Sequence, residues 1–325
     1  GQLWQGRKLL RLISATPARL GSISSGQTPP PILADRLVTR IRERVGRVLG
    51  FLTDPRRWKN IPRRLTYLIF SQLIAARRRM GLRSSLRPLD HIWASTEVSN
   101  IDSIFITAAT KVTYIHTLDY DQVLAVRDSA GESNQRVVLI DSMGPLHPDY
   151  LLIYGDSLLS TENYSAIICQ GLDEIEDRLG TDIVVAAHPR AVPGLMDPWY
   201  GGREVIYGKT AELIANATAV IVSSGSTAIG IAVVFQRPLL LLNSNRFDSF
   251  VQGRSRAAAQ ALDRQLIDLD APELPHFTLD VNTDAYARYV QKYIKQQGSP
   301  EKPFWSVVAS EIVSGAKPPG GKSAQ

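Results

Sequence analysis

The sequence has 325 residues, 44% of them hydrophobic and 21% charged, which is typical of a globular protein with room for two domains. A single cysteine, Cys169, excludes an internal disulfide framework and indicates a reducing compartment, so we expect a cytoplasmic protein. No apolar run reaches the roughly 20 residues of a transmembrane helix, and Arg7, Lys8 and Arg11 interrupt the apolar residues of any signal peptide. Contact with the inner membrane face is therefore expected to be peripheral.

Positive charge is concentrated at the beginning of the chain. Residues 1–90 contain 19 Lys or Arg and four Asp or Glu, a net charge of +15, whereas the whole chain carries +6. Apolar residues recur at helical spacing between arginines in residues 33–52, and a second helix is predicted over residues 62–80. We predict a basic helical region over residues 1–90, with residues 33–80 binding an anionic membrane surface. The alternative is a solvated helical face packed on the next domain.

After residue 90, short β-rich runs alternate with helical stretches, which predicts parallel sheets of the doubly wound type and an α/β fold. We place an N-terminal domain at residues 91–160 and a C-terminal domain, whose last helix crosses back, at residues 161–314. A disordered tail follows at residues 315–325. Strands are predicted at residues 112–117, 136–143, 183–187, 219–222 and 238–242, and helices at residues 163–179, 210–216, 226–235, 283–295 and 303–313.

The segment AVIVSSGST, residues 219–227, carries the strongest chemical signal. An apolar strand leads into hydroxyl side chains and a glycine, and a helix follows. Backbone N–H groups and the positive end of the helix dipole at such a turn bind anions, and ligands of open α/β sheets lie at the carboxyl ends of strands. We predict a phosphate site made by Ser223, Ser224, Gly225, Ser226 and Thr227. The alternative is a simple serine N-cap.

Two further strand ends carry basic side chains. In VVAAHPR, residues 184–190, an apolar strand ends at His188, which can donate to a phosphate or a sugar carboxylate, and Arg190 adds a bidentate donor. In IYGKT, residues 206–210, Lys209 follows a short strand and opens a helix, from where it can reach a nucleotide. A capping histidine and a solvated lysine are the alternatives.

Acidic residues and further histidines follow two other strands. In VLIDSMGPLHPDY, residues 138–150, Asp141 is placed to act as base or nucleophile, with His147 nearby. An Asx turn is the alternative for Asp141. In YIHTLDYD, residues 114–121, His116 and Asp119 are candidates to line the acceptor side, and structural hydrogen bonding is equally compatible with them.

Together, these motifs resemble the bacterial glycosyltransferases of cell-surface carbohydrates that use CMP-activated acidic sugars. These are the Kdo transferases and the bacterial sialyl- and polysialyltransferases. The resemblance covers residues of about 110–245 and rests on an HP motif, His188-Pro189, and a Ser-rich motif at residues 223–227. It implies two Rossmann-like domains of the GT-B type, with both motifs holding the CMP part of the donor. It also implies an acidic catalytic residue in the N-terminal domain, for which Asp141 is the best match.

The predicted reaction is transfer of an ulosonic acid, Kdo or sialic acid, from a CMP-linked donor to a glycan or glycolipid acceptor. The Asp/Glu-Asp/Glu-Gly motif of polysialyltransferases is missing, which places Kdo or a related acid ahead. We expect no cofactor and no nucleic acid. We also expect no metal, because cationic side chains and helix N–H groups would neutralise the phosphate. One alternative is a polyol-phosphate transferase with a CDP-linked donor. The other is a non-catalytic adaptor that binds membrane or nucleic acid through its basic region. No G-x-G-x-x-G or Walker A motif indicates a dehydrogenase or P-loop enzyme.

Overall fold

The computed structural model describes most of the chain after residue 105 and short segments before it. The predicted helices at residues 33–52 and 62–80 lie outside the described residues, as does the predicted tail beyond Gly315. The described residues are 20–24, 28–32, 88–97, 106–129, 131, 136–147, 160–223, 226–247 and 249–315.

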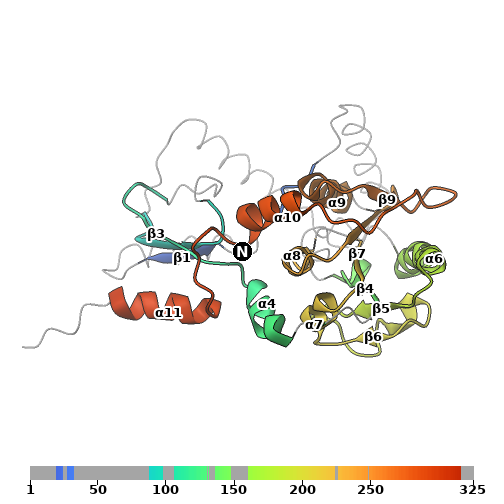
Figure 1. Cartoon of the computed structure of the whole chain (residues 1–325), viewed down its shortest axis with the longest axis horizontal. Helices are drawn as coiled ribbons and strands as arrows, with labels where there is room; N and C mark the ends of the chain where they lie inside the picture. Colours follow the sequence, from blue (N-terminus) through green and yellow to red (C-terminus); the bar gives the residue numbers. More distant parts are fainter. Residues whose placement is uncertain are drawn as a thin grey trace, which may run out of the picture.

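The strands of the described residues form two parallel sheets (Figure 1). The smaller sheet has the order β1-β2-β3, with strands Gly21–Ser24, His91–Ala94 and Lys111–Tyr114. Both neighbouring pairs are parallel. The prediction of a helical region over residues 1–90 is therefore wrong for β1, because a strand distant in sequence, β2, satisfies its backbone groups.

The larger sheet has six strands in the order β6-β5-β4-β7-β8-β9. The chain enters at β4 in the middle, moves outward through β5 and β6, and then returns to the other side of β4 for β7, β8 and β9. This is the Rossmann order, with its topological switch point between β4 and β7, and it confirms the predicted doubly wound α/β class. The strands are Val137–Ile140, Ile183–Ala186, Val205–Ile206, Ala219–Val222, Leu239–Asn243 and Leu266–Asp268.

Helices cover both faces of the larger sheet, so its central strands are buried throughout and read as continuous apolar runs. One face, with Val137 and Leu139 of β4, packs against α6. The other face, with Val138 and Ile140, packs against the remaining connecting helices. The four connecting helices that cover the two faces are α6 (Thr161–Leu179), α7 (Thr210–Ala215), α8 (Ile229–Val234) and α9 (Ser249–Leu262).

In the described part of the chain, two crossing segments after β3 connect the sheets, and residues 28–32, between β1 and β2, also contact α9. After β3 it continues into α4 (Tyr120–Val126), which packs against α7 and α8 of the larger unit. After α10 (Thr283–Tyr289) and a π-helical turn (Val290–Ile294) it returns to the smaller sheet as α11 (Phe304–Gly315). Figure 1 shows α11 beside β1 and β3, away from the larger sheet. The predicted return of the last helix is thus observed.

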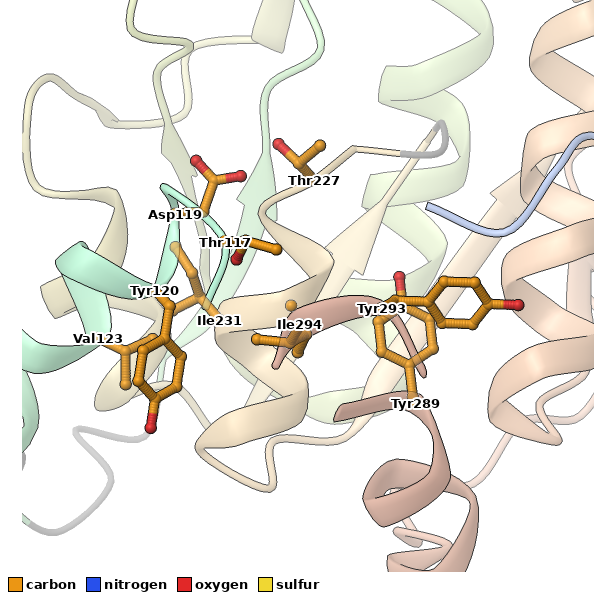
Figure 2. Close-up of a pocket in the computed structure, with 10 residues that line it drawn as sticks. Thr117, Asp119, Tyr120, Val123, Thr227, Ile231, Tyr289, Tyr293 and Ile294 are labelled. Atoms are coloured by element: carbon orange, nitrogen blue, oxygen red, sulfur yellow. The ribbon is translucent and has the colours of Figure 1, made fainter. Parts of the chain in front are cut away.

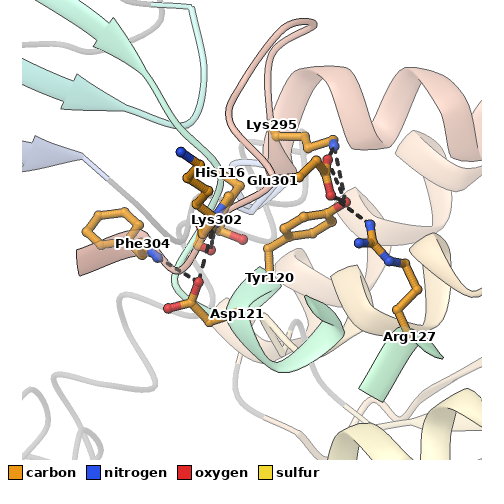
Figure 3. Close-up of polar contacts among 9 residues, drawn as sticks. His116, Tyr120, Asp121, Arg127, Lys295, Glu301, Lys302 and Phe304 are labelled. Atoms are coloured by element: carbon orange, nitrogen blue, oxygen red, sulfur yellow. Dashed lines mark hydrogen bonds and ion pairs between the residues drawn. The ribbon is translucent and has the colours of Figure 1, made fainter. Parts of the chain in front are cut away.

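Polar contacts join the two crossing segments (Figure 3). The Thr117 amide donates to the Ile294 carbonyl over 2.9 Å, and Asp121 Oδ1 accepts from the Phe304 amide over 2.8 Å. The Tyr120 hydroxyl donates to the Glu301 carboxylate, which also binds Arg127 and Lys295. The connection between the sheets is therefore held by hydrogen bonds and ion pairs as well as by chain continuity.

Most elements after residue 105 lie close to their predicted ranges, with two differences that matter for the site. β4 pairs with β5 and β7, so the larger sheet begins before the boundary placed at residue 160. The helix predicted from residue 226 begins at Ile229, because Ser226 accepts the Ala228 amide in a turn. The helices α4 and α9 and the strands β2 and β9 have no predicted counterpart.

Candidate functional site

Three predicted site residues meet at the switch point of the larger sheet. Asp141, His188 and Ser223 each lie just beyond the carboxyl end of a strand, β4, β5 and β7 respectively, and these three strands are direct neighbours. The carboxyl ends of parallel strands lie at one edge, and a crevice opens there where the strand order reverses. His188 and Ser223 therefore lie in one sheet as predicted, whereas Asp141, which the sequence places in a separate N-terminal domain, follows the strand that lies between theirs.

The Asp141 carboxylate is buried, with 3% of the residue exposed, and its oxygens accept three hydrogen bonds. Oδ1 accepts from the Met143 amide over 2.6 Å and from the Tyr200 hydroxyl over 2.5 Å, and Oδ2 accepts from the His188 amide over 3.1 Å. Burial, with Tyr164 and Asp141 nearby, raises the pKa of Tyr200 far above its ordinary value, so this phenol stays protonated and donates. The catalytic role of Asp141 stays a prediction, and the geometry favours the alternative Asx turn.

Three hydroxyl groups lie close together beside this carboxylate and form a triangle. The Tyr164 hydroxyl lies 3.2 Å from Ser142 Oγ and 3.1 Å from Ser223 Oγ, and the two serine oxygens are 3.3 Å apart. Burial raises the pKa of Tyr164, and the bonds from Ser142 and Ser223 oppose that shift only in part. Ser223 is 3% exposed, so its hydroxyl is engaged in the protein.

The turn after β4 fits closely under Tyr164. Gly144 has a φ of +42°, and a Cβ at this position would lie 2.6 Å from the Tyr164 ring. Only glycine therefore fits here without displacing the tyrosine. Sequence reasoning missed Tyr164 and Tyr200, because their contacts with the strand ends come from tertiary packing. A tyrosine on the apolar face of the predicted helix at residues 163–179 is the sole signal for Tyr164.

Two histidines lie together at the same edge. The rings of His147 and His188 are 5.3 Å apart with an interplanar angle of 80°. His188 Nδ1 accepts from the Arg190 amide over 3.1 Å, so in the neutral imidazole the proton is on Nε2. His188 therefore presents an N–H donor from Nε2, and both rings are half-buried rather than enclosed.

The other predicted phosphate ligands differ in exposure. Arg190 and Lys209 are exposed, and Lys209 immediately precedes α7 as predicted. Ser226 is half-buried and Thr227 is exposed. Ser224 and Gly225 lie outside the described residues, so their predicted role stays a prediction.

A pocket lies between the first crossing segment, the start of α8 and the π-helical turn (Figure 2). Asp119 and Thr227 line one end of it, and Tyr289 and Tyr293 line the other. Asp119 is half-buried, and no donor within the described part of the chain hydrogen-bonds to its carboxylate; it makes no side-chain cap on α4. A carboxylate thus lines this pocket without a hydrogen bond from any donor of the described residues.

His116 lies outside this pocket and is fully buried. Its Nε2 is 2.8 Å from the Lys302 carbonyl and 3.7 Å from the Asp121 carboxylate, and its Nδ1 is 2.9 Å from the Thr117 carbonyl (Figure 3). These contacts correspond to the structural alternative, in which His116 joins the two crossing segments.

Within the described residues no three His, Cys, Asp or Glu side chains are grouped as a metal site requires. None of the helices in that part of the chain is long and apolar enough to span a bilayer.

No protein-family model matches the chain, and no curated protein matches it. Among solved structures, the chain is similar to the glycosyltransferase SnogD from Streptomyces nogalater, with 12% identity, a TM-score of 0.39, and coverage of 69% of this chain and 55% of that one. It is similar to the glycosyltransferase of kitacinnamycin, with 14% identity, a TM-score of 0.37, and coverage of 87% and 64%. It is also similar to MurG of Acinetobacter baumannii, with 12% identity, a TM-score of 0.30, and coverage of 69% and 60%. The chain therefore spans less than two thirds of the length of each of these structures.

Proposed function

We propose that this chain is a glycosyltransferase that binds a nucleotide-activated sugar at the carboxyl ends of β4, β5 and β7. The observation that carries the proposal is the meeting of Asp141, His188 and Ser223 at the switch point of a Rossmann-ordered sheet. Ligands of open α/β sheets bind at this point. The charge there suits an anion, because three donors compensate Asp141 while His188 presents an N–H group.

We propose that the donor is a CMP-activated sugar, preferably an ulosonic acid such as Kdo or sialic acid. The support is the resemblance of His188-Pro189 and the Ser-rich turn to the CMP-binding motifs of that group. Arg190 and Lys209 follow the neighbouring strands β5 and β6 and are exposed to solvent at the same edge of the sheet. A phosphate and a sugar carboxylate are the two anions that such a donor would bring.

We propose Asp119 as the general base. A base needs a carboxylate that can reach the acceptor hydroxyl and accept its proton, and the half-buried Asp119 faces the pocket beside Thr227 (Figure 2). The acceptor oxygen would form the new bond to the anomeric carbon as the bond to the nucleotide phosphate breaks. His188 would donate to the departing phosphate, and Asp119 would hold the proton. Asp141 would act as a positioning residue that fixes the His188 backbone.

A nucleotide screen tests the proposal. We expect CMP to raise the melting temperature more than UMP, GMP or AMP, because a ligand present at about 100 times its Kd stabilises the native state by about 2.7 kcal/mol. His188→Ala should remove most of the shift and leave the unliganded protein folded. His276→Ala is the matched control, since His276 is exposed and lies in the loop that binds the end of α6, away from the switch point.

Three outcomes would redirect the proposal. Equal stabilisation of wild type and His188→Ala by CMP would remove His188 from the site. Hydrolysis of CDP-glycerol in preference to CMP-linked sugars would favour the polyol-phosphate transferase. Absence of any nucleotide effect would contradict both enzymes and favour the adaptor.

A further inference from the structure

The turn that carries Asp119 is held on both sides by the second crossing segment, which runs from the π-helical turn to α11. Before Asp119, the Thr117 amide donates to the Ile294 carbonyl over 2.9 Å. After it, Asp121 Oδ1 accepts from the Phe304 amide over 2.8 Å (Figure 3). Asp119 makes no side-chain cap on α4, and no described donor bonds to its carboxylate. Its place in the pocket therefore follows from the contacts of its neighbours.

Glu301, in the same crossing segment, is the common acceptor of three donors. The Tyr120 hydroxyl donates to its carboxylate over 3.1 Å, and Arg127 Nη1 donates over 2.8 Å (Figure 3). Lys295 Nζ pairs with this carboxylate and donates to the Tyr120 hydroxyl over 3.1 Å. Tyr120 is the first residue of α4 and Arg127 follows its last residue, so one carboxylate binds both ends of the helix.

The negative charge of Glu301 also holds two cations together. Arg127 follows α4, whereas Lys295 belongs to the second crossing segment, and without the carboxylate these like charges would repel each other. Burial, with the positive Arg127 nearby, lowers the pKa of Lys295. A neutral side chain at position 301 would therefore loosen α4 from the second crossing segment, while the contacts of Thr117 and Asp121 would remain.

We propose that Glu301 is a positioning residue that holds α4 so that the Asp119 carboxylate meets the acceptor hydroxyl. Asp119 immediately precedes α4, and Tyr120, which Glu301 binds, lines the same pocket (Figure 2). A base must lie within hydrogen-bond reach of the proton that it accepts, and a displacement of about 1 Å can cost about 100-fold in rate. The inference rests on the proposed glycosyl transfer and on Asp119 as its base.

Glu301→Gln tests this role, because the amide keeps the size of the side chain and can still accept from Tyr120. The substrate is CMP-Kdo or CMP-sialic acid, whichever the wild type cleaves. We expect kcat for CMP release to fall about tenfold. The KM of the donor and the Kd of CMP should stay within about twofold, since the CMP site lies at the switch point. In the Asp119→Asn background, Glu301→Gln should cause no further fall, because Glu301 acts through Asp119.

Glu311→Gln is the matched control. Glu311 pairs with Lys111 over 2.5 Å, so it joins α11 to the smaller sheet rather than to α4. Its side chain is 31% exposed, compared with 39% for Glu301. We expect its kcat to stay within about twofold of wild type. If Glu301→Gln does not fold, Arg127→Gln replaces it. The Arg127 side chain is 49% exposed, and its removal loosens the same contact, so kcat should fall by at least about threefold.

The other results overturn the inference in distinguishable ways. Equal falls of kcat in Glu301→Gln and Glu311→Gln would make Glu301 a general contact between the two units. A further fall in the Asp119→Asn background would give Glu301 a role apart from Asp119. Unchanged kcat in Glu301→Gln, with an inactive Asp119→Asn, would overturn the role of Glu301 alone. An active Asp119→Asn would overturn it together with the base, and absence of CMP binding would overturn the proposed function as well.

Discussion

Two aspartates beside the proposed crevice have opposite surroundings. Asp141, at the end of β4, is buried and accepts hydrogen bonds from two backbone amides and a tyrosine. Asp119, between β3 and α4, is half-buried and faces a pocket with no hydrogen bond to its carboxylate from the described residues. A position at a strand end brings a carboxylate to the site. The donors around it decide whether it organises the backbone or accepts a proton from a substrate.

Asp119→Asn should have the largest effect. The amide keeps the size of the side chain and removes the base, so we expect kcat to fall by at least about 100-fold, which is the lower end for a positioned proton-transfer group. CMP binding and melting temperature should remain as in wild type. The measurement is the rate of CMP release from the activated sugar, together with a CMP titration.

Asp128→Asn is the matched control for this variant. Asp128 lies after α4, the helix that Asp119 precedes. Its side chain is 96% exposed, and its ion-pair partner is the neighbouring Arg127. We expect its kcat to stay within about twofold of wild type, since an exposed ion pair contributes little. If Asp119→Asn retained activity within a few-fold of wild type, Asp119 would not be the base.

Asp141→Asn should change stability more than chemistry. Its amide group would face donors, and hydrogen bonds to a charged acceptor would be lost, so we expect the free energy of unfolding to fall by about 2 kcal/mol. CMP binding should weaken as well, because Asp141 holds the His188 amide. Urea unfolding and a CMP titration measure the two effects. Unchanged stability with a kcat at least about 100-fold lower would return the base role to Asp141.

Sequence patterns identify the elements that are buried and local. β5 and β7 are short apolar runs that end in polar residues, and their predicted and observed ranges differ by at most one residue. Their carboxyl ends meet because parallel pairing fixes them at one edge, so His188 and Ser223 could be placed together from sequence.

Elements that are stabilised by partners distant in sequence cannot be predicted from local sequence patterns. β1, with the sequence GSIS, has no apolar pattern and is a strand because it pairs with β2. The surroundings of Asp141 could not be predicted for the same reason, since the Tyr200 hydroxyl that donates to Asp141 is 59 residues away in the sequence. The exposure of Asp119 likewise depends on α8 and the π-helical turn, which form the rest of its pocket.

Tyr164→Phe tests the buried hydroxyl network beside Asp141. The substitution removes one hydroxyl from the triangle and leaves Ser142 and Ser223 3.3 Å apart, so they can still bond to each other. We expect the free energy of unfolding to fall by about 1 kcal/mol, the net value of an ordinary hydrogen bond. A CMP affinity within about twofold of wild type would agree with a structural role for the triangle. A loss of CMP binding without a loss of stability would show that the triangle contacts the nucleotide.

The smallest effect is expected at a third strand-end aspartate, Asp270, which follows β9. Burial opposes its ionisation, but bonds from the Asn245 amide, the Ser244 hydroxyl and Arg246 outweigh burial and hold the pKa of Asp270 below its ordinary value. Because the folded pKa is depressed, the stabilisation is fully present above the unfolded pKa of about 3.9 and is lost as the pH falls through the folded pKa. Asp270→Asn should therefore be less stable than wild type at pH 7, by less than about 1 kcal/mol, and the difference should shrink below about pH 3. Urea unfolding of both proteins at the two pH values measures it. A difference of equal size at both would mean that Asp270 acts through packing rather than charge.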